Sequence, residues 1–285
     1  MMKAFRFLIM AVMAFVMAAC NSSDDPEPEP FSQSCDTPLT FEWFDDNSGE
    51  LAITCYRRGY LWYKVDDGEW ILCNGDDIII PLTKNQTVMF RGENAANFED
   101  ICTHIFANGN CYIYGNIMSL IKGAKEDWGN MVEEDLSAAN TLEFEHTFEQ
   151  LFCYEDNGKY LYNHPSKELL LPATSLTPYC YNMMFMGCSN LERTPELPAS
   201  IVPYYGYCQM FSGCTKLNYI KCLATDISAE HCTDLWVYDV ARNGTFVVNS
   251  SLTVTGDSPT YKTVWGDGQN FHGIPNGDWT VTNTQ

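Results

Sequence analysis

The sequence lacks the residue patterns that most catalytic and metal centres require. Its five histidines never stand at H-x-x-x-H or H-E-x-x-H spacing: His104, His146, His164, His231 and His272. It has no C-x-x-C pair for zinc or redox chemistry. It also has no G-x-S-x-G nucleophile elbow, no glycine-rich phosphate loop and no dinucleotide fingerprint. We therefore expect a protein that is not an enzyme and that holds no metal and no cofactor.

Positive charge is scarce. The 285 residues include 16 Lys and Arg against 37 Asp and Glu, a formal net charge of −21. Residues 1–19 contain Lys3 and Arg6 and no acidic residue, so the chain without them carries 14 − 37 = −23. This balance argues against nucleic acid as a partner, since phosphates need a basic footprint. It also argues against docking on anionic lipid through a polybasic patch.

Only one long apolar run is present, at the N-terminus. Lys3 and Arg6 precede the run from Phe7 to Val16, and small residues then lead to Cys20. This order is typical of a secretory signal and not of a retained membrane span. Cleavage near residue 19 with an incidental Cys20 is one outcome. We favour the other, a lipobox, in which residues 1–19 are the signal peptide and Cys20 is acylated; each buried methylene then adds about 0.8 kcal/mol of anchoring.

Residues 20–34 predict a tether. The stretch "NSSDDPEPEPFSQS" (21–34) combines proline and acidic residues with almost no apolar partner, so it cannot form a core and should be extended. The stretch from Ser22 to Asp25 resembles the acidic surface-export signal of lipoproteins in one group of Gram-negative anaerobes. The resemblance implies an outer-membrane lipoprotein that faces the cell exterior; a tether on the periplasmic side is the alternative.

Twelve cysteines follow Cys20. An even count in an exported chain suggests disulfides, yet a chain of this length can bury a core without them. Several of these cysteines stand inside apolar patterns, where a thiol behaves as a small buried hydrophobe. We expect mostly free, buried thiols, with an occasional disulfide left open.

Residues 35–116 contain about seven short segments in which apolar and polar residues alternate, separated by Asn, Asp and Gly. The clearest is "YKVDDGEWIL" (63–72), in which Asp67 and Gly68 supply the positive φ angles of a tight hairpin turn. This spacing predicts an immunoglobulin-like β-sandwich domain over residues 35–116.

Aromatic residues cluster in the same region. A candidate glycan-binding platform consists of Trp62, Trp70, Tyr60 and Tyr63. The simpler interpretation is that alternate aromatic side chains fill the core of the sandwich while their neighbours lie on its surface.

A repeat of 26 residues follows. Residues 171–196 and 197–222 share ten identities, including "MFMGC" against "MFSGC". A fixed period in the twenties predicts stacked units that share one core. Helical spacing predicts a short helix ending near Gly187, with Phe185 packed on Phe211. The predicted repeat core consists of Leu171, Met184, Phe185, Cys188, Leu191, Leu197, Met210, Phe211, Cys214 and Leu217.

This pattern resembles the BspA-type leucine-rich repeats of bacterial surface proteins. The positions that carry it are Leu171, Pro172, Ala173, Cys180, Tyr181, Met184, Phe185, Gly187, Cys188, Leu191, Pro195 and Glu196. The resemblance implies a right-handed solenoid with a strand and a short helix or turn per unit, and a binding or adhesive role. Gly206 in place of Cys180 and the insert at 249–271 depart from the pattern.

The sequence thus predicts a mixed α+β chain: a β-sandwich at 35–116, a leucine-rich-repeat solenoid with degenerate caps at 117–248, and a C-terminal cap or tail at 249–285. We expect a monomeric surface lipoprotein, anchored in the outer membrane, that binds an extracellular protein or matrix partner through its repeats. Two alternatives stay open. One is a glycan-binding lipoprotein of a polysaccharide-uptake system, and the other is a structural spacer of the envelope.

Overall fold

The structure of the chain is a computed structural model. It describes residues 34–54, 60–73, 77–93, 103–127, 130–153, 157–256, 258–266 and 272–284. The predicted signal peptide 1–19, Cys20 and the tether up to residue 33 lie outside the described residues. Phe31–Gln285 form one compact unit.

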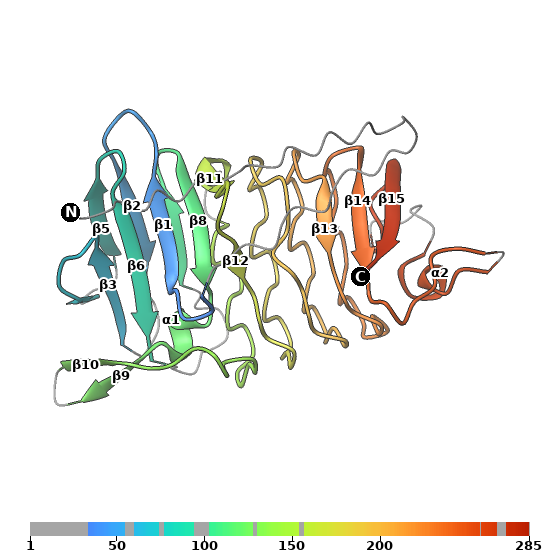
Figure 1. Cartoon of the computed structure of the whole chain (residues 1–285), viewed down its shortest axis with the longest axis horizontal. Coiled ribbons are helices and arrows are strands. Elements are labelled where there is room, and N and C mark those ends of the chain that lie inside the picture. The colour runs from blue at the N-terminus through green and yellow to red at the C-terminus, as the bar shows by residue number, and fades with distance from the viewer. Residues whose placement is uncertain are drawn as a thin grey trace, which may run out of the picture. The chain divides into compact units, whose positions relative to one another are not determined.

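Two β-sheets make up the first part of this unit (Figure 1). The larger sheet has the order β11-β8-β1-β6-β3-β4, and β12 also pairs with β8. Its strands are β1 Leu39–Trp43, β3 Leu61–Val65, β4 Ile71–Leu72, β6 Thr87–Gly92, β8 Cys111–Asn116, β11 Leu161–Asn163 and β12 Leu169–Leu170. The smaller sheet has the order β5-β2-β7, with β5 Asp77–Leu82, β2 Gly49–Thr54 and β7 His104–Ala107.

The inward-facing residues of both sheets belong to one hydrophobic core. Along β1, Phe41 and Trp43 are buried, and the Phe41 ring lies 5.8 Å from that of Phe90 on β6 in an edge-on arrangement. From the smaller sheet, Leu51 and Ile53 enter the same core. Alternation along each strand therefore sets which face is buried.

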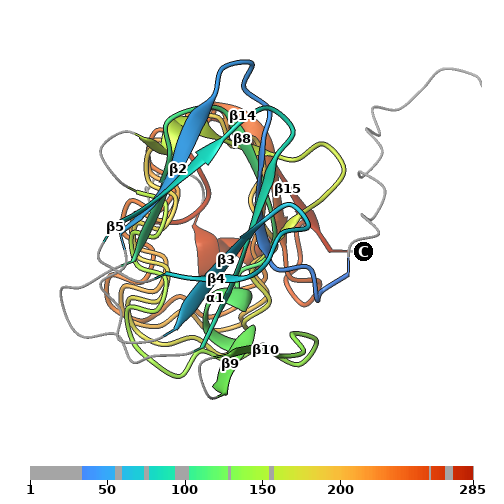
Figure 2. The same cartoon turned by 90° about the vertical axis from the view of Figure 1, so that its left-hand side faces the viewer.

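The repeat region consists of turns on one side and short parallel strands on the other. Seen from the left-hand side of Figure 1, successive units lie one behind another (Figure 2). Parallel pairing joins β13 Tyr219–Lys221, β14 Asn243–Val248 and β15 Asp278–Asn283. The remaining elements are α1 Ser119–Lys122, α2 Tyr261–Trp265, the 3-10 turn η1 Asn157–Tyr160, and the hairpin of β9 Ala124–Asp127 and β10 Asn130–Glu133.

In each unit the turns follow one another along the chain at four-residue intervals. We call the series of turns in one unit a turn row. A positive φ recurs at Tyr179, Met183 and Gly187 in one unit, and at matching positions of the next. The N–H of Asn182 donates to the carbonyl of Tyr179 over 3.2 Å and closes a turn. The N–H of Met183 donates instead to Cys208 of the next unit over 2.9 Å. Alternate backbone donors are thus satisfied within the unit and between units.

The predicted fold class is wrong. Residues 171–240, which the structure describes throughout, contain turns, bridges and β13 but no helix, so they do not form the strand–helix units of a leucine-rich-repeat solenoid. The helix was predicted wrongly for a physical reason. Four-residue turns place Tyr181, Phe185 and Cys188 on one buried side at nearly the spacing of a helical face.

The boundary predicted between a sandwich and a repeat domain does not separate two sheets. β11 and β12 lie within the predicted solenoid at 117–248, yet both pair in parallel with β8 of the predicted sandwich at 35–116. The N–H of Ile105 on β7 donates to the carbonyl of Leu151 in the first turn row. The mixed sheets are thus continuous with the stacked turns, and the immunoglobulin-like assignment is corrected with the rest of the fold class.

The packing predicted for the repeat core is confirmed. The rings of Phe185 and Phe211 stack with centroids 5.4 Å apart and planes within 4°, and Phe152 lies 5.1 Å from Phe185. All ten predicted core residues are buried. Gly187 and Gly213 adopt φ of 76° and 77°, where a side chain would be strained.

Truncation of Phe211 tests this stack. We expect Phe211→Ala to lower the free energy of unfolding by about 3–5 kcal/mol, because it removes a fully buried ring between two others. Denaturant unfolding measures the change. Tyr238→Ala, which truncates a ring that is 46% exposed in the next turn row, should stay within about 0.5 kcal/mol of the parent. A similar loss in both variants would contradict the buried stack.

The buried thiols give a second test. Cys111, Cys180, Cys188, Cys214 and Cys222 are free and fully buried. Burial raises the pKa of Cys180 and of Cys222 to about 12, so at about pH 8 both stay protonated and unreactive.

We expect a thiol-alkylating reagent to modify exposed Cys35 in the native protein and to leave Cys180 and Cys222 untouched until denaturant is added. Mass spectrometry of the peptides reads each site. Labelling of Cys180 at the rate of Cys35 in the native state would contradict the packing.

Candidate functional site

A column of stacked rings runs across four successive turn rows. It consists of His146, Tyr179, Tyr205 and His231, and we call it the ring column. Ring centroids lie 4.4 Å apart for His146 and Tyr179, 4.9 Å for Tyr179 and Tyr205, and 4.8 Å for Tyr205 and His231. All four side chains are partly exposed. The column therefore presents ring edges and polar atoms to solvent.

The backbone at every ring of the column is left-handed. The φ angles of His146, Tyr179, Tyr205 and His231 lie between 54° and 57°. Such angles cost free energy for a residue with a side chain, on the order of 1 kcal/mol or more. The bonds between units hold the backbone there, for example that from the N–H of Tyr179 to the carbonyl of Tyr204, 3.1 Å long. The rings are thus fixed before any partner arrives.

Tyr204 widens the column at its centre. Its ring packs edge-on against Tyr205 at 4.6 Å and against Tyr179 at 5.5 Å, and its side chain is 39% exposed. Burial and the contact with Tyr204 raise the pKa of Tyr179 to about 12, and burial raises that of Tyr205. Near neutral pH these phenols are protonated and can donate hydrogen bonds.

A carboxylate lies at each end of the ring column. At one end the Nδ1 of His146 contacts Glu149, and the Nδ2 of Asn182 donates to Glu149 over 2.6 Å. At the other end Asp234 accepts from the Nδ1 of His231 at 2.6 Å, and its second oxygen lies 2.9 Å from the Nδ1 of His272. The hydrogen bond to Asp234 raises the pKa of His231.

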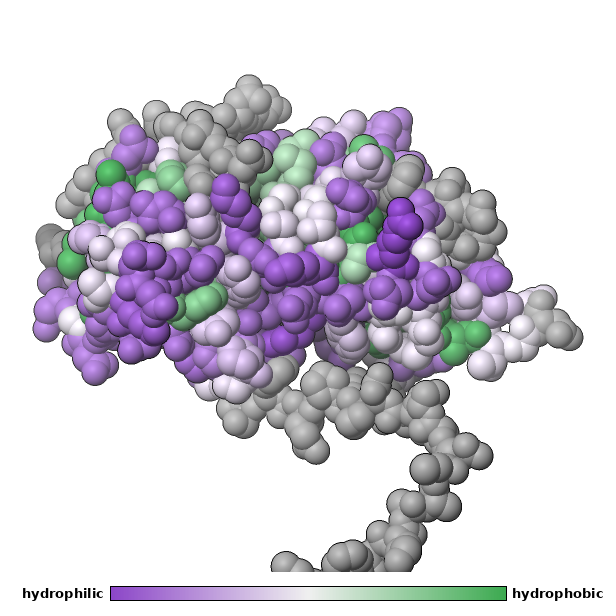
Figure 3. All heavy atoms as spheres, turned by 90° about the horizontal axis from the view of Figure 1, so that it is seen from above, coloured by the Kyte–Doolittle hydropathy of each residue, from purple (hydrophilic) through white to green (hydrophobic). Residues whose placement is uncertain are grey.

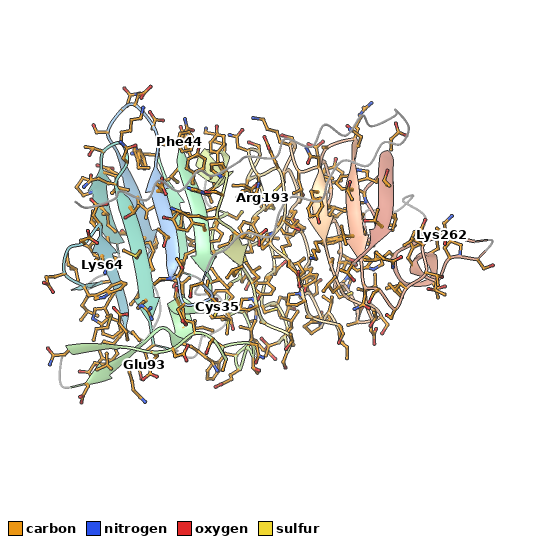
Figure 4. All side chains as sticks on the ribbon, in the orientation of Figure 1. Cys35, Phe44, Lys64, Glu93, Arg193 and Lys262 are labelled. Atoms are coloured by element: carbon orange, nitrogen blue, oxygen red, sulfur yellow. The ribbon has the colours of Figure 1, made fainter. Side chains whose placement is uncertain are left out.

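A pocket of about 390 Å³ opens beside His231. It lies between the last turn row and α2, whose position Lys262 marks in Figure 4. Asp234, His272 and Trp265 line it. Trp265 is 2% exposed, and within the described part of the chain its indole N–H has no hydrogen-bond partner. The ring column thus ends at a polar concavity.

The structure separates the residues of the predicted glycan platform. Trp62 is 4% exposed and stacks on Tyr60 at 5.5 Å. Tyr63, the next residue of β3, packs on the opposite side against the core. The indole N–H of Trp70 donates to Glu133 of β10 over 3.0 Å, and Lys64 lies 5.0 Å from the Trp70 ring centroid. These four side chains therefore do not form one open face.

The sequence contained a signal for the ring column. Tyr179 and Tyr205 are matched identities in the 26-residue repeat, although neither is part of the predicted core. His146 and His231 stand at the corresponding positions of the flanking units. Their place in the ring column follows only from the backbone hydrogen bonds that align the turn rows.

Comparison with protein-family models, with curated proteins and with solved structures finds no match for this chain. Over the described ranges, no three His, Cys, Asp or Glu side chains are arranged to hold a metal ion. The helices that the structure describes are too short to span a bilayer.

The contact between His231 and Asp234 can be tested by titration. A raised pKa means that the folded state holds the proton more tightly than the unfolded chain does. The contact thus stabilises the fold below the ordinary histidine value near 6.5, and the effect is lost as the pH rises through the raised pKa.

NMR titration of the His231 imidazole should give a pKa above 6.5, and Asp234→Asn should lower it. Asp239→Asn, in the same turn row, is the matched control and should leave it unchanged. An unshifted value in Asp234→Asn would refute the contact.

Proposed function

We propose that the protein is a non-catalytic binding protein that engages an extracellular protein or matrix partner through the ring column. The observation that carries this proposal is a pre-ordered set of tyrosine and histidine rings at the surface of the turn rows. Rigid tyrosines lose little conformational entropy on binding and are enriched where interface residues contribute most to affinity.

Other exposed apolar and aromatic side chains of the turn rows support the same proposal. Tyr204, Leu235 and Tyr238 are 39%, 38% and 46% exposed, and all belong to the turn rows. An aromatic and apolar centre surrounded by polar groups is the usual composition of a protein interface.

The charge around the ring column favours a basic partner. Glu149, Glu230 and Asp234 flank its two ends, and the whole chain carries a net charge of −21. An acidic surface of this kind attracts partners that expose Lys and Arg and speeds their association at low salt. Binding should therefore weaken as the salt concentration rises.

The N-terminal sequence motivates the location in this proposal. The secretory pattern and Cys20 support a lipid anchor in the outer membrane, and the acidic tether supports an outward-facing position. A monomer held in this way would present the ring column to neighbouring cells or matrix.

Binding to immobilised matrix proteins tests the proposal. Fibronectin, laminin and collagen serve as probes, and surface plasmon resonance measures the dissociation constants. We expect Tyr204→Ala and Tyr205→Ala each to weaken binding by about tenfold or more, since each removes an anchoring ring.

Tyr60→Ala is the matched control. It truncates a ring that is 43% exposed but lies before β3, away from the turn rows, so affinity should be unchanged. If no probe binds, or if the two turn-row variants bind like the control, the ring column is not the binding surface.

A further inference from the structure

A second cluster of aromatic and charged side chains lies on the outer face of the larger sheet. Glu42 of β1, Tyr112 of β8 and Tyr162 of β11 face the same side, because Glu42 pairs with Tyr112 and Tyr112 with Tyr162 in the sheet register. Phe44, the residue directly after β1, lies beside them. Lys167 reaches them from the segment between β11 and β12. We call these five residues the sheet-face cluster.

Three rings of the cluster form a connected, half-buried surface. The Phe44 ring stacks on that of Tyr112 with centroids 4.2 Å apart, and Tyr162 meets Phe44 edge-on at 5.1 Å. Figure 4 shows Phe44 at the upper end of the larger sheet and Arg193 among the repeats that follow. Seen from above Figure 1, the surface is mostly hydrophilic, with isolated apolar residues (Figure 3).

A charged pair lies beside the rings. The Nζ of Lys167 donates to the Oε2 of Glu42 over 2.9 Å and also lies 4.0 Å from the ring centroid of buried Tyr114. The Nε2 of His164 is 3.5 Å from the same Glu42 oxygen. Burial, followed by the nearby charge of Lys167, lowers the pKa of His164, so near neutral pH the imidazole is uncharged.

Buried groups hold the Glu42–Lys167 pair in place on its inner side. His164 is 7% exposed, its carbonyl accepts from the Nη2 of Arg193 over 2.6 Å, and its ring lies 5.1 Å from Tyr112 and 5.2 Å from Tyr114. The Glu42 and Lys167 side chains remain 28% and 38% exposed. Both charged groups are therefore held in place and still reachable from solvent.

These features match the chemistry of a sugar ring. A pyranose has an apolar C–H face, which packs on an aromatic ring, and a rim of hydroxyls that both donate and accept hydrogen bonds. Around the rings, Glu42 accepts, Lys167 donates, and the hydroxyls of Tyr112 and Tyr162 can do either. Because Lys167 is neutralised by Glu42, the cluster offers no surplus positive charge to an anionic ligand.

We propose that the sheet-face cluster binds a neutral oligosaccharide chain, with Phe44 and Tyr162 as its aromatic contacts and the Glu42–Lys167 pair as the hydroxyl-binding group; Tyr112 stacks on Phe44 and holds that ring in place. This site shares no residue with the ring column and does not depend on it. It also differs from the platform around Trp62 and Trp70 that the sequence suggested.

Affinity gel electrophoresis of the full-length protein tests the proposal. Gels containing β-glucan, xylan, galactomannan or starch present neutral chains, and gels containing polygalacturonate or heparin present acidic ones. We expect retardation by at least one neutral polymer and none by the acidic ones. Titration calorimetry with the matching hexasaccharide then gives the affinity.

The variants separate binding from folding. Phe44→Ala and Tyr162→Ala should each weaken binding at least tenfold, whereas Tyr162→Phe should retain most of it. Glu42→Gln removes the charge with little change of volume and should weaken binding several-fold even if a ring variant proves unstable. Tyr204→Ala, which removes a ring beside the ring column, is the matched control for the sheet-face cluster and should bind sugar like the parent.

The proposal is overturned by any of three results: no retardation by any neutral polymer, retardation by acidic polymers alone, or unchanged binding in Phe44→Ala and Tyr162→Ala. None of these would affect the outcome at the ring column, because its own variants and protein probes are separate.

Discussion

The backbone hydrogen bonds between successive units are the constraint on which the repeat region depends. Along each turn row, every second N–H donates to the residue that precedes its counterpart in the next unit, as Phe185 does to Met210 and Tyr181 to Gly206. Equivalent side chains must then lie over one another. The same bonds therefore build the buried stack of Phe185 on Phe211 and, on the outside, the ring column.

The period and the buried residues of the repeats could be predicted from the sequence, but their backbone could not. Tyr181, Phe185 and Cys188 follow a spacing that a helix and a series of four-residue turns satisfy almost equally well. The positive φ angles at Tyr179 and Met183 distinguish the turns from a helix, and tyrosine and methionine are not residue types that favour such an angle. The sheet continues through β11 and β12, which pair with β8 some fifty residues earlier in the chain. The alternation of apolar and polar residues along one strand does not predict which distant strand it pairs with.

The candidate sites show a similar limit. The sequence suggested that Trp62 and Trp70 form a binding platform. In the structure the segment around β9 and β10 lies against this part of the sheet. Glu133 contacts Trp70, and Arg91 donates to the carbonyls of Gly123 and Glu134. The Glu42–Lys167 pair, by contrast, joins residues 125 positions apart. Only the assembled sheet brings them together.

The left-handed glycines at 187 and 213 indicate how such an array can grow. A β-carbon at Gly213 would lie in van der Waals contact with the backbone of Gly187, 3.5 Å away, so these units meet at equivalent points. An in-frame duplication of the segment 197–222 would insert a layer whose donors and acceptors already match both neighbours. Lengthening this protein by whole layers is therefore structurally simple, and each added layer would bring one more tyrosine, the counterpart of Tyr205, to the ring column.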